Sequence, residues 1–198
     1  NLFTTAGLFS GFYAIVASMN DRFIEAAVAI FIAMVFDGLD GRVARMTNTE
    51  SDFGAEFDSM ADIVSFGMAP ALVMYNYALA DLGKIGWLAA FIFVAGGALR
   101  LARFNTNLGS SDKKFFQGLA IPSAAAIVAG LVWVGSEYGV EGSDIAGFAA
   151  VVTICAGLRD CCDATIISAV LYILYLCFIR SGINHKECEE IEVGPCCW

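Results

Sequence analysis

Charged residues are scarce in this chain. Only 16% of its 198 residues are charged, 59% are hydrophobic, and the mean hydropathy is +0.72. These values lie outside the range of ordinary soluble domains and indicate a chain that crosses a membrane several times. Positive charge is the scarcer sign, with 11 Lys and Arg against 20 Asp and Glu, so a nucleic-acid partner is not expected. The length fits one compact bundle and does not fit a second domain.

Cysteine and histidine are absent before residue 155. The chain's seven cysteines and its one histidine all come later: Cys155, Cys161, Cys162, Cys177, Cys188, Cys196, Cys197 and His185. Their spacings match no zinc pattern, and a cytoplasmic tail should stay reduced. The abrupt change of composition fits a shifted reading frame or a non-native end. We therefore divide the chain into a membrane domain, residues 1–157, and a tail, residues 158–198, to which we assign no chemistry.

The membrane domain contains six apolar stretches, at residues 5–19, 23–37, 59–80, 85–104, 118–135 and 145–158. Lipid offers the backbone no hydrogen bonds, so each stretch is expected to be a helix. Several are shorter than the roughly 20 residues that a span needs, but flanking residues can complete them. The fold class predicted is all-α, a polytopic membrane bundle of about six transmembrane helices.

Basic residues predict the orientation of this bundle. Arg22 and Lys84 lie on one side of the predicted membrane, and the loop Ser136–Asp144 has no Lys or Arg. The other side carries six basic residues: Arg42, Arg45, Arg100, Arg103, Lys113 and Lys114. Because cytoplasmic loops are enriched in Lys and Arg, this richer side and the N-terminus are predicted to be cytoplasmic.

Four aspartates stand at helical spacing beside that cytoplasmic side. Asp37 ends the second stretch and Asp40 follows it, whereas Asp58 directly precedes the third stretch and Asp62 lies in its first turn. At 100° per residue, the first pair shares an arc of about 140° with Gly41, Ala44 and Arg45, and the second pair shares about 80° with Gly54. Two helices joined by a short loop are antiparallel neighbours, so the two acidic faces can meet.

Carboxylates at membrane depth are costly, and four that converge repel one another unless a cation lies between them. Oxygen ligands suit Mg²⁺ or Mn²⁺, and four acids allow two ions. Two metals suit a diphosphate substrate that undergoes displacement at phosphorus. Gly41 and Gly54 leave room for a ligand, and Arg45 offers donors to a phosphate. Singly, these residues would indicate helix packing and a head-group contact; the complete spacing indicates a site.

The pattern Asp37-x2-Asp40-Gly41-x2-Ala44-Arg45-x8-Gly54-x3-Asp58-x3-Asp62 resembles, at every fixed position, the signature of the CDP-alcohol phosphatidyltransferases. Four further segments resemble the phosphatidylserine synthase branch of that family. They are Asn1-Leu2-Phe3 with Gly11-Phe12, Phe66–Ala71, Ala98–Asn105 and Phe116–Pro122. Ala120 stands where the branch pattern has proline. The resemblance covers roughly residues 1 to 157.

This resemblance implies a role for each signature residue. Asp37, Asp40, Asp58 and Asp62 would hold two divalent ions, Mg²⁺ or Mn²⁺, that bind the diphosphate of CDP-diacylglycerol. Asp62 would also be the general base for the hydroxyl of L-serine, which displaces CMP and forms phosphatidylserine. The residues expected to bind the donor are Asn1, Thr4, Gly41, Ala44, Arg45, Ser51 and Gly54. The enzyme would be an integral membrane protein with its site at the cytoplasmic face, and homodimers are common in such families.

The acceptor serine carries a carboxylate that needs a cation. Arg100 and Arg103 lie one helical turn apart, so they share a face. One or both are predicted to bind the serine carboxylate or a lipid phosphate; alternatively they are basic anchors at the cytoplasmic boundary.

Two other functions are compatible with parts of the pattern. A sister enzyme with another substrate would share every signature residue. Examples are an enzyme with inositol phosphate or glycerol phosphate as the acceptor, or one with an archaeal lipid donor. A metal-ion transporter would string its acids across the membrane and would show inverted repeats. Here the acids gather at one end and no repeat is visible, so the enzyme is the preferred hypothesis.

Overall fold

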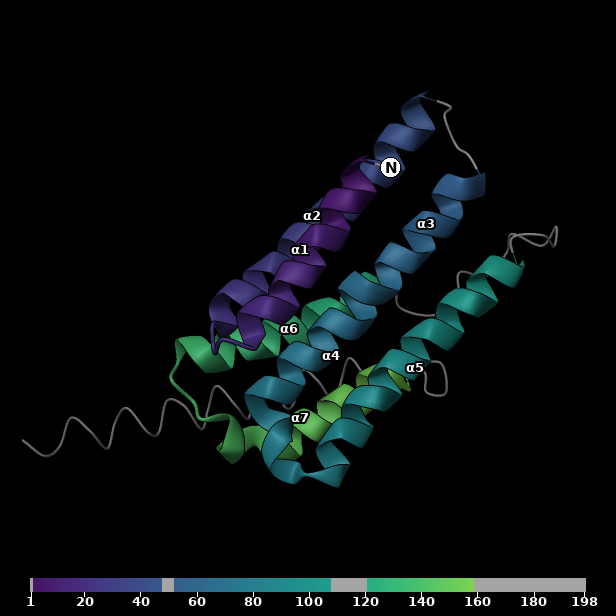
Figure 1. Cartoon of the computed structure of the whole chain (residues 1–198). Helices are drawn as coiled ribbons and strands as arrows, with labels where there is room; N and C mark the ends of the chain where they lie inside the picture. The colour runs from purple at the N-terminus through teal and green to yellow at the C-terminus, as the bar shows by residue number, and fades with distance from the viewer. Residues whose placement is uncertain (1, 48–51, 108–120, 159–198) are drawn as a thin grey trace, which may run out of the picture. The chain divides into compact units, whose positions relative to one another are not determined.

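The structure, a computed structural model, describes residues 2–47, 52–107 and 121–158. In these ranges every regular element is a helix, and no strand occurs. The helices follow one another as six segments within one compact unit, Asn1–Cys161. The first two segments are α1 (Leu2–Ser18) and α2 (Phe23–Thr47), and the last three are α5 (Lys84–Asn107), α6 (Ile121–Glu137) and α7 (Gly142–Gly157) (Figure 1).

The third segment, between α2 and α5, changes its helical type along its length. It runs through α3 (Asp52–Asp62), the π-helical η1 (Ile63–Met68), α4 (Ala69–Met74), the π-helical η2 (Tyr75–Leu79) and the short 3₁₀ turn η3 (Ala80–Leu82). In η1 the backbone N–H of Ala69 donates to the carbonyl of Val64, five residues back. Pro70 follows directly, has no N–H, and would crowd the preceding turn of a regular α-helix. The wider π turn accommodates it within one continuous helix.

The acidic motif residues continue two of the predicted helices. α2 runs to Thr47 instead of ending near residue 37, and α3 begins at Asp52 instead of near residue 59. The expectation that flanking residues complete a short apolar stretch is therefore confirmed for the second helix, and the third helix also extends beyond its apolar stretch. α1, α6 and α7 are only 16 or 17 residues long.

Two helical segments are long and apolar enough to cross a membrane, Phe53–Leu82 and Lys84–Arg103. α2 is 25 residues long, but it carries Glu25, Asp37, Asp40 and Arg42. The all-helical fold class is confirmed for the part of the chain that the structure describes, and six membrane spans stay a prediction. The predicted tail lies outside the described residues, apart from Leu158 at its start.

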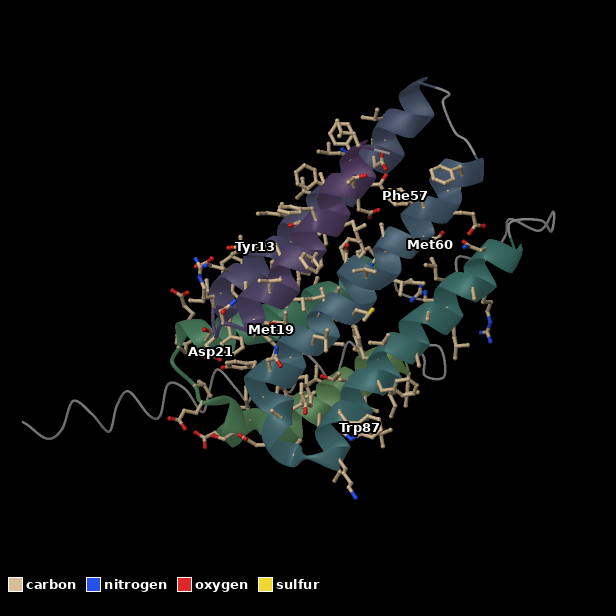
Figure 2. The ribbon with its side chains drawn as sticks, in the orientation of Figure 1. Tyr13, Met19, Asp21, Phe57, Met60 and Trp87 are labelled. Carbon is tan, nitrogen blue, oxygen red and sulfur yellow. The ribbon has the colours of Figure 1, made fainter. Side chains whose placement is uncertain are left out.

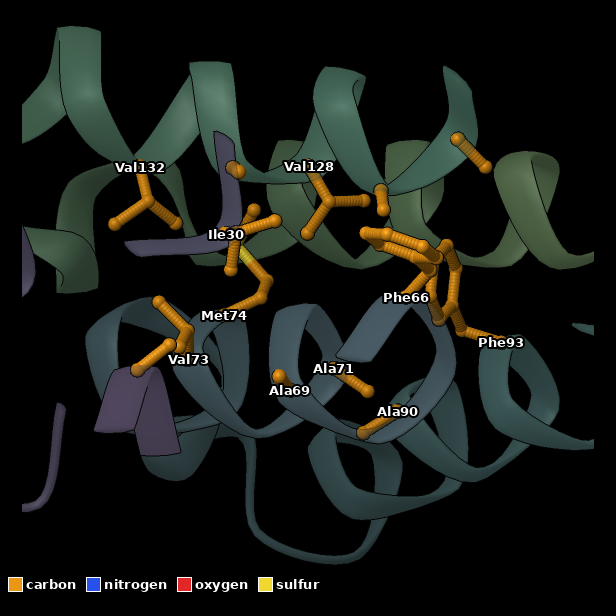
Figure 3. Close-up of a cluster of buried hydrophobic side chains, with 14 of the residues drawn as sticks. Ile30, Phe66, Ala69, Ala71, Val73, Met74, Ala90, Phe93, Val128 and Val132 are labelled. Carbon is orange, nitrogen blue, oxygen red and sulfur yellow. The ribbon is translucent and has the colours of Figure 1, made fainter. Parts of the chain in front are cut away.

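Small side chains dominate the core. Most of its buried apolar residues are alanines, and Ala14, Ala26, Ala33 and Ala69 are completely buried. Larger side chains fill the centre, where Phe66 and Met74 of the third segment meet residues of the other helices: Ile30 of α2, Phe93 of α5, and Val128 and Val132 of α6 (Figure 3). Small residues let helix backbones approach closely, as is typical of helices that pack in membranes.

Glycine permits the closest of these approaches. A Cβ atom on Gly96 of α5 would overlap the backbone carbonyl of Gly157 in α7, lying only 2.9 Å from its carbon. On Gly11 of α1 it would lie 2.7 Å from the Cα of Ser65 in η1. Glycine at these positions therefore sets how near α7 and η1 lie to their partner helices.

The start of α1, the end of α2, the start of α3 and the end of α5 lie at one end of this unit (Figure 1). Two hydrogen bonds tie these helix ends together, one between Thr4 and Asp40 and one between Asn105 and Ser59. Met19, Asp21 and Trp87 lie toward the opposite end, whereas Phe57 and Met60 project from α3 near the first (Figure 2). The signature residues are thus gathered at a single end.

Candidate active site

Three of the four predicted aspartates meet. Asp37 projects from α2, and Asp58 and Asp62, one turn apart, project from α3. Each offers one carboxylate oxygen, and the three oxygens lie within 4.8 Å of one another. All three side chains are half-buried. These residues form a cluster, here called the aspartate cluster, that could hold a metal ion.

The acidic faces of α2 and α3 meet, as the spacing predicts, but the closest backbone contacts of α3 are with other elements. α3 packs against α1 and η1, and its backbone does not pack closely against α2, although α2 precedes it in the chain. Gly11 on α1 favours this arrangement, since it lets η1, which continues α3, approach α1 at contact distance. α2 and α3 therefore meet through their carboxylate side chains, while their backbones stay further apart.

The fourth aspartate, Asp40, has a different partner. Its Oδ2 accepts a hydrogen bond from the hydroxyl of Thr4, which is only 5% exposed in α1. Asp40 is not among the three residues whose oxygens converge. Thr4 therefore fixes the orientation of this carboxylate one turn away from Asp37.

A small cavity adjoins the aspartate cluster. Its polar wall consists of Thr4, Asp37, Asp58, Asp62 and Ser65, and its apolar wall of Gly7, Leu8, Ala33, Ala61 and Phe66. The Ser65 hydroxyl donates to the carbonyl of Gly7 at 3.3 Å, which links η1 to α1. Sequence reasoning missed Ser65; its position three residues after Asp62, on the same helix face, was the available signal.

The other predicted donor-binding residues lie on the same helices. Gly41 is exposed on α2, and a Cβ atom there would meet no other atom within 4 Å. Gly54 is partly buried on α3, and the α2 backbone remains helical through Ala44 and Arg45. Asn1 and Ser51 lie outside the described residues.

α5 brings polar groups to the same end of the unit. The side-chain amide of Asn105 donates to the Ser59 hydroxyl of α3 at 3.1 Å. Of the two predicted acceptor arginines, Arg103 is exposed and Arg100 is partly buried. The Nη1 atom of Arg100 is buried and has no hydrogen-bond partner within the described ranges.

The aspartate cluster fits a hard divalent cation. Its donors are carboxylate oxygens, the ligands that Mg²⁺ and Mn²⁺ prefer, and neither histidine nor cysteine lies among them. Three half-buried carboxylates in such proximity repel one another, and a cation between them would remove that repulsion.

Comparison with known proteins decides the family. The family model for CDP-alcohol phosphatidyltransferases matches residues 1–158. The chain belongs to the CDP-alcohol phosphatidyltransferase family. This is a family of transferases, and its phosphatidylserine synthases are membrane-associated.

Individual curated proteins are also similar to the chain in sequence. A protein of Helicobacter pylori strain J99 is 45% identical over 138 residues, which are 70% of this chain and 58% of the relative. One of Methanocaldococcus jannaschii is 48% identical over 109 residues, 55% of this chain and 51% of the relative. One of Saccharomyces cerevisiae is 37% identical over 139 residues, which are 63% of this chain and 50% of the relative. Each is named a CDP-diacylglycerol–serine O-phosphatidyltransferase, and the chain spans between half and three fifths of their lengths.

Proposed function

We propose that this protein transfers the phosphatidyl group of CDP-diacylglycerol to the hydroxyl of L-serine, releasing CMP and forming phosphatidylserine. The observation that carries the proposal is the convergence of Asp37, Asp58 and Asp62. The names of the curated relatives support serine as the acceptor.

In this proposal Asp37, Asp58 and Asp62, together with Asp40, hold two divalent cations, Mg²⁺ or Mn²⁺. When bound, the cations neutralise the donor's diphosphate and make CMP a good leaving group without a separate acid. Asp62 accepts the proton of the serine hydroxyl, whose oxygen attacks the phosphorus that bears diacylglycerol. The bond from that phosphorus to the CMP oxygen breaks, and CMP leaves with the bonding electrons. A base is required because a serine hydroxyl is a poor nucleophile while protonated.

Donor recognition is assigned to the signature residues around the aspartate cluster. Gly41 and Gly54 leave space for the CDP moiety, and the open surroundings of Gly41 support this assignment. Thr4 acts through Asp40, to which it donates. The remaining donor contacts are assigned to Asn1, Ala44, Arg45 and Ser51, and acceptor contacts to Arg100 and Arg103.

The proposed enzyme is a multi-pass membrane protein whose transferase domain ends near residue 157 and which could work as a homodimer. Two helical segments that are apolar enough to span a membrane support the first point. Arg100 and Arg103 lie at the same end of α5 as Asn105, which bonds to the acid-bearing α3. A site at the cytoplasmic face agrees with the excess of basic residues near cytoplasmic boundaries.

Release of CMP from CDP-diacylglycerol tests the proposal directly. The purified protein in detergent should release CMP only when serine and Mg²⁺ or Mn²⁺ are both present, and a chelator should abolish the reaction. Asp62→Asn should remove turnover while the protein remains in the membrane fraction, because the amide neither accepts the proton nor balances a cation. Asp81→Asn, on an exposed aspartate outside the aspartate cluster, is the matched control and should keep full activity. Release that depends on a phosphorylated polyol instead of serine would identify a sister enzyme.

A further inference from the structure

Ser59 of α3 and Asn105 of α5 are joined by a hydrogen bond, and the proposed function assigns a role to neither residue. The Asn105 amide nitrogen donates to Ser59, which leaves the carbonyl oxygen Oδ1 of Asn105 as an acceptor that this bond does not use. Ser59 adjoins Asp58 and precedes Asp62 by three residues, so it lies within one helical turn of the proposed base. Asn105 therefore bonds to the turn of α3 that carries Asp58 and Asp62.

Arg100 lies on the same helix as Asn105. α5 returns antiparallel to the third segment after the turn at Gly83 and packs against η1. Five residues before Asn105, at 1.5 Å per residue, Arg100 lies about 7.5 Å deeper along α5. The register fixed by Asn105 and Ser59 then places Asp62 at a level between Asn105 and Arg100.

The buried Nη1 of Arg100 requires an explanation. It has no hydrogen-bond partner in the described part of the chain, and a charged donor left unpaired inside a protein is destabilising. A planar guanidinium matches a carboxylate in geometry and charge. An anchor at the membrane boundary would instead turn its nitrogens toward water and lipid head groups.

We propose that Ser59, Asn105 and Arg100 form the subsite for the amino-acid acceptor, here called the α3–α5 seam. Arg100 binds the acceptor's carboxylate, and Asn105 Oδ1 accepts a hydrogen bond from its ammonium group. The acceptor hydroxyl then points to Asp62, whose level along the helix axis is between those of Asn105 and Arg100. The proposal rests on the transferase function above and assigns the carboxylate to Arg100 in preference to the exposed Arg103.

Acceptors that lack one of serine's two charged groups test the seam. CMP release from CDP-diacylglycerol is measured with serine, with ethanolamine, which lacks the carboxylate, and with glycerate, which lacks the amine. Arg100→Gln should raise the KM for serine by about 10- to 100-fold and reduce the preference for serine over ethanolamine, as expected for a lost hydrogen bond to a charged group. Asn105→Ala should reduce the preference for serine over glycerate. The KM for CDP-diacylglycerol should stay within about twofold of the wild-type value in both variants.

Lys84→Gln removes a cation from the far end of α5 and is the matched control; all its constants should equal those of the wild type. Arg100→Lys keeps the charge without the planar fork, and should fall between the wild type and Arg100→Gln in its KM for serine. An unchanged KM for serine in both Arg100 variants would overturn the proposal. So would a rise in the KM for CDP-diacylglycerol alone, because Arg100 would then serve a lipid phosphate. Absence of serine-dependent CMP release from the wild type would refute the proposed function itself, which is a different result.

Discussion

At the scale of single residues, the hydrogen bond from Thr4 to Asp40 distinguishes the four signature aspartates. Asp37, Asp58 and Asp62 face one another, whereas Asp40 is held by a buried hydroxyl from another helix. A donor that orients a carboxylate also sets the direction of its remaining lone pairs. Thr4 thus acts as a positioning residue for any cation that Asp40 helps to bind.

Removing the Thr4 hydroxyl should weaken metal binding. Thr4→Val keeps the size of the side chain, but the Asp40 carboxylate loses its donor, and metal affinity should fall by about 10- to 100-fold, as for other residues that orient metal ligands. The Mg²⁺ concentration that gives half-maximal CMP release measures the effect. Thr4→Ser retains the hydroxyl and should restore most of the affinity. Equal behaviour of the two variants would show that the hydroxyl has no such role.

The position of each acidic residue along the chain could be predicted from spacing, because helical geometry alone puts residues three or four apart on one face. The bond between Thr4 and Asp40 could not be predicted in this way. It joins residues 36 positions apart, and depends on how α1 crosses the end of α2. The same holds for Ser65, whose place in the cavity depends on the packing of η1 against α1.

At the scale of helices, contact between backbones determines the arrangement. α5 and α7 approach so closely that Gly96 has no room for a side chain, whereas a Cβ atom on the adjacent Gly97 would meet nothing within 4 Å. Both glycines lie inside α5, so their intrinsic helix propensities are equal. They form a natural pair for measuring the energy of this contact.

Gly96→Ala should destabilise the protein and Gly97→Ala should not. The added methyl group at position 96 would force α7 away from α5, at a cost of about 1–3 kcal/mol that is typical of overpacking. At position 97 alanine should stabilise the helix by up to about 1 kcal/mol, through its better helix propensity. Thermal unfolding of the two variants in the same detergent measures the difference. Similar melting temperatures would show that α7 shifts without cost.

Hydropathy predicts the positions of all six helical segments along the chain, but it does not predict which helices pack against each other. The sequence predicts α2 and α3 as neighbours because a short loop joins them, and their carboxylates do meet, but the backbone of α3 packs more closely against α1. The π turns were also unpredictable, since apolar residues continue through them without a break in composition. Pro70 is the one local feature that indicates a departure from regular α-helix there.

At the scale of the whole molecule, the aspartate cluster connects stability to the cation. Carboxylates from α2 and α3 repel each other in a half-buried site, and a cation that binds them favours the folded state. Stability and activity should therefore depend on the same ion.

Mg²⁺ should raise the melting temperature of the wild-type protein and a chelator should lower it. At a cation concentration 100 times the Kd, the stabilisation is about 2.7 kcal/mol. Asp37→Asn should reverse the order of the two melting temperatures between the two conditions. The variant should melt above the wild type in chelator, because one repelling charge is gone, and below it in saturating Mg²⁺, because one ligand is gone. Asp81→Asn should follow the wild type under both conditions. Parallel shifts of the wild type and Asp37→Asn with Mg²⁺ would mean that the ion binds elsewhere.

The π turn η1 has a consequence for how this protein can vary. It separates the carboxylates of α3 from the Pro70 region of α4, and a five-residue hydrogen-bond register interrupts the 3.6-residue rhythm between them. The wide turn therefore gives the α3 carboxylates a rotational setting relative to α4 that differs from the one in an uninterrupted α-helix. Deletion of one residue that restored regular α-helix through η1 should turn Asp58 and Asp62 by about 100° relative to α4, and so away from Asp37.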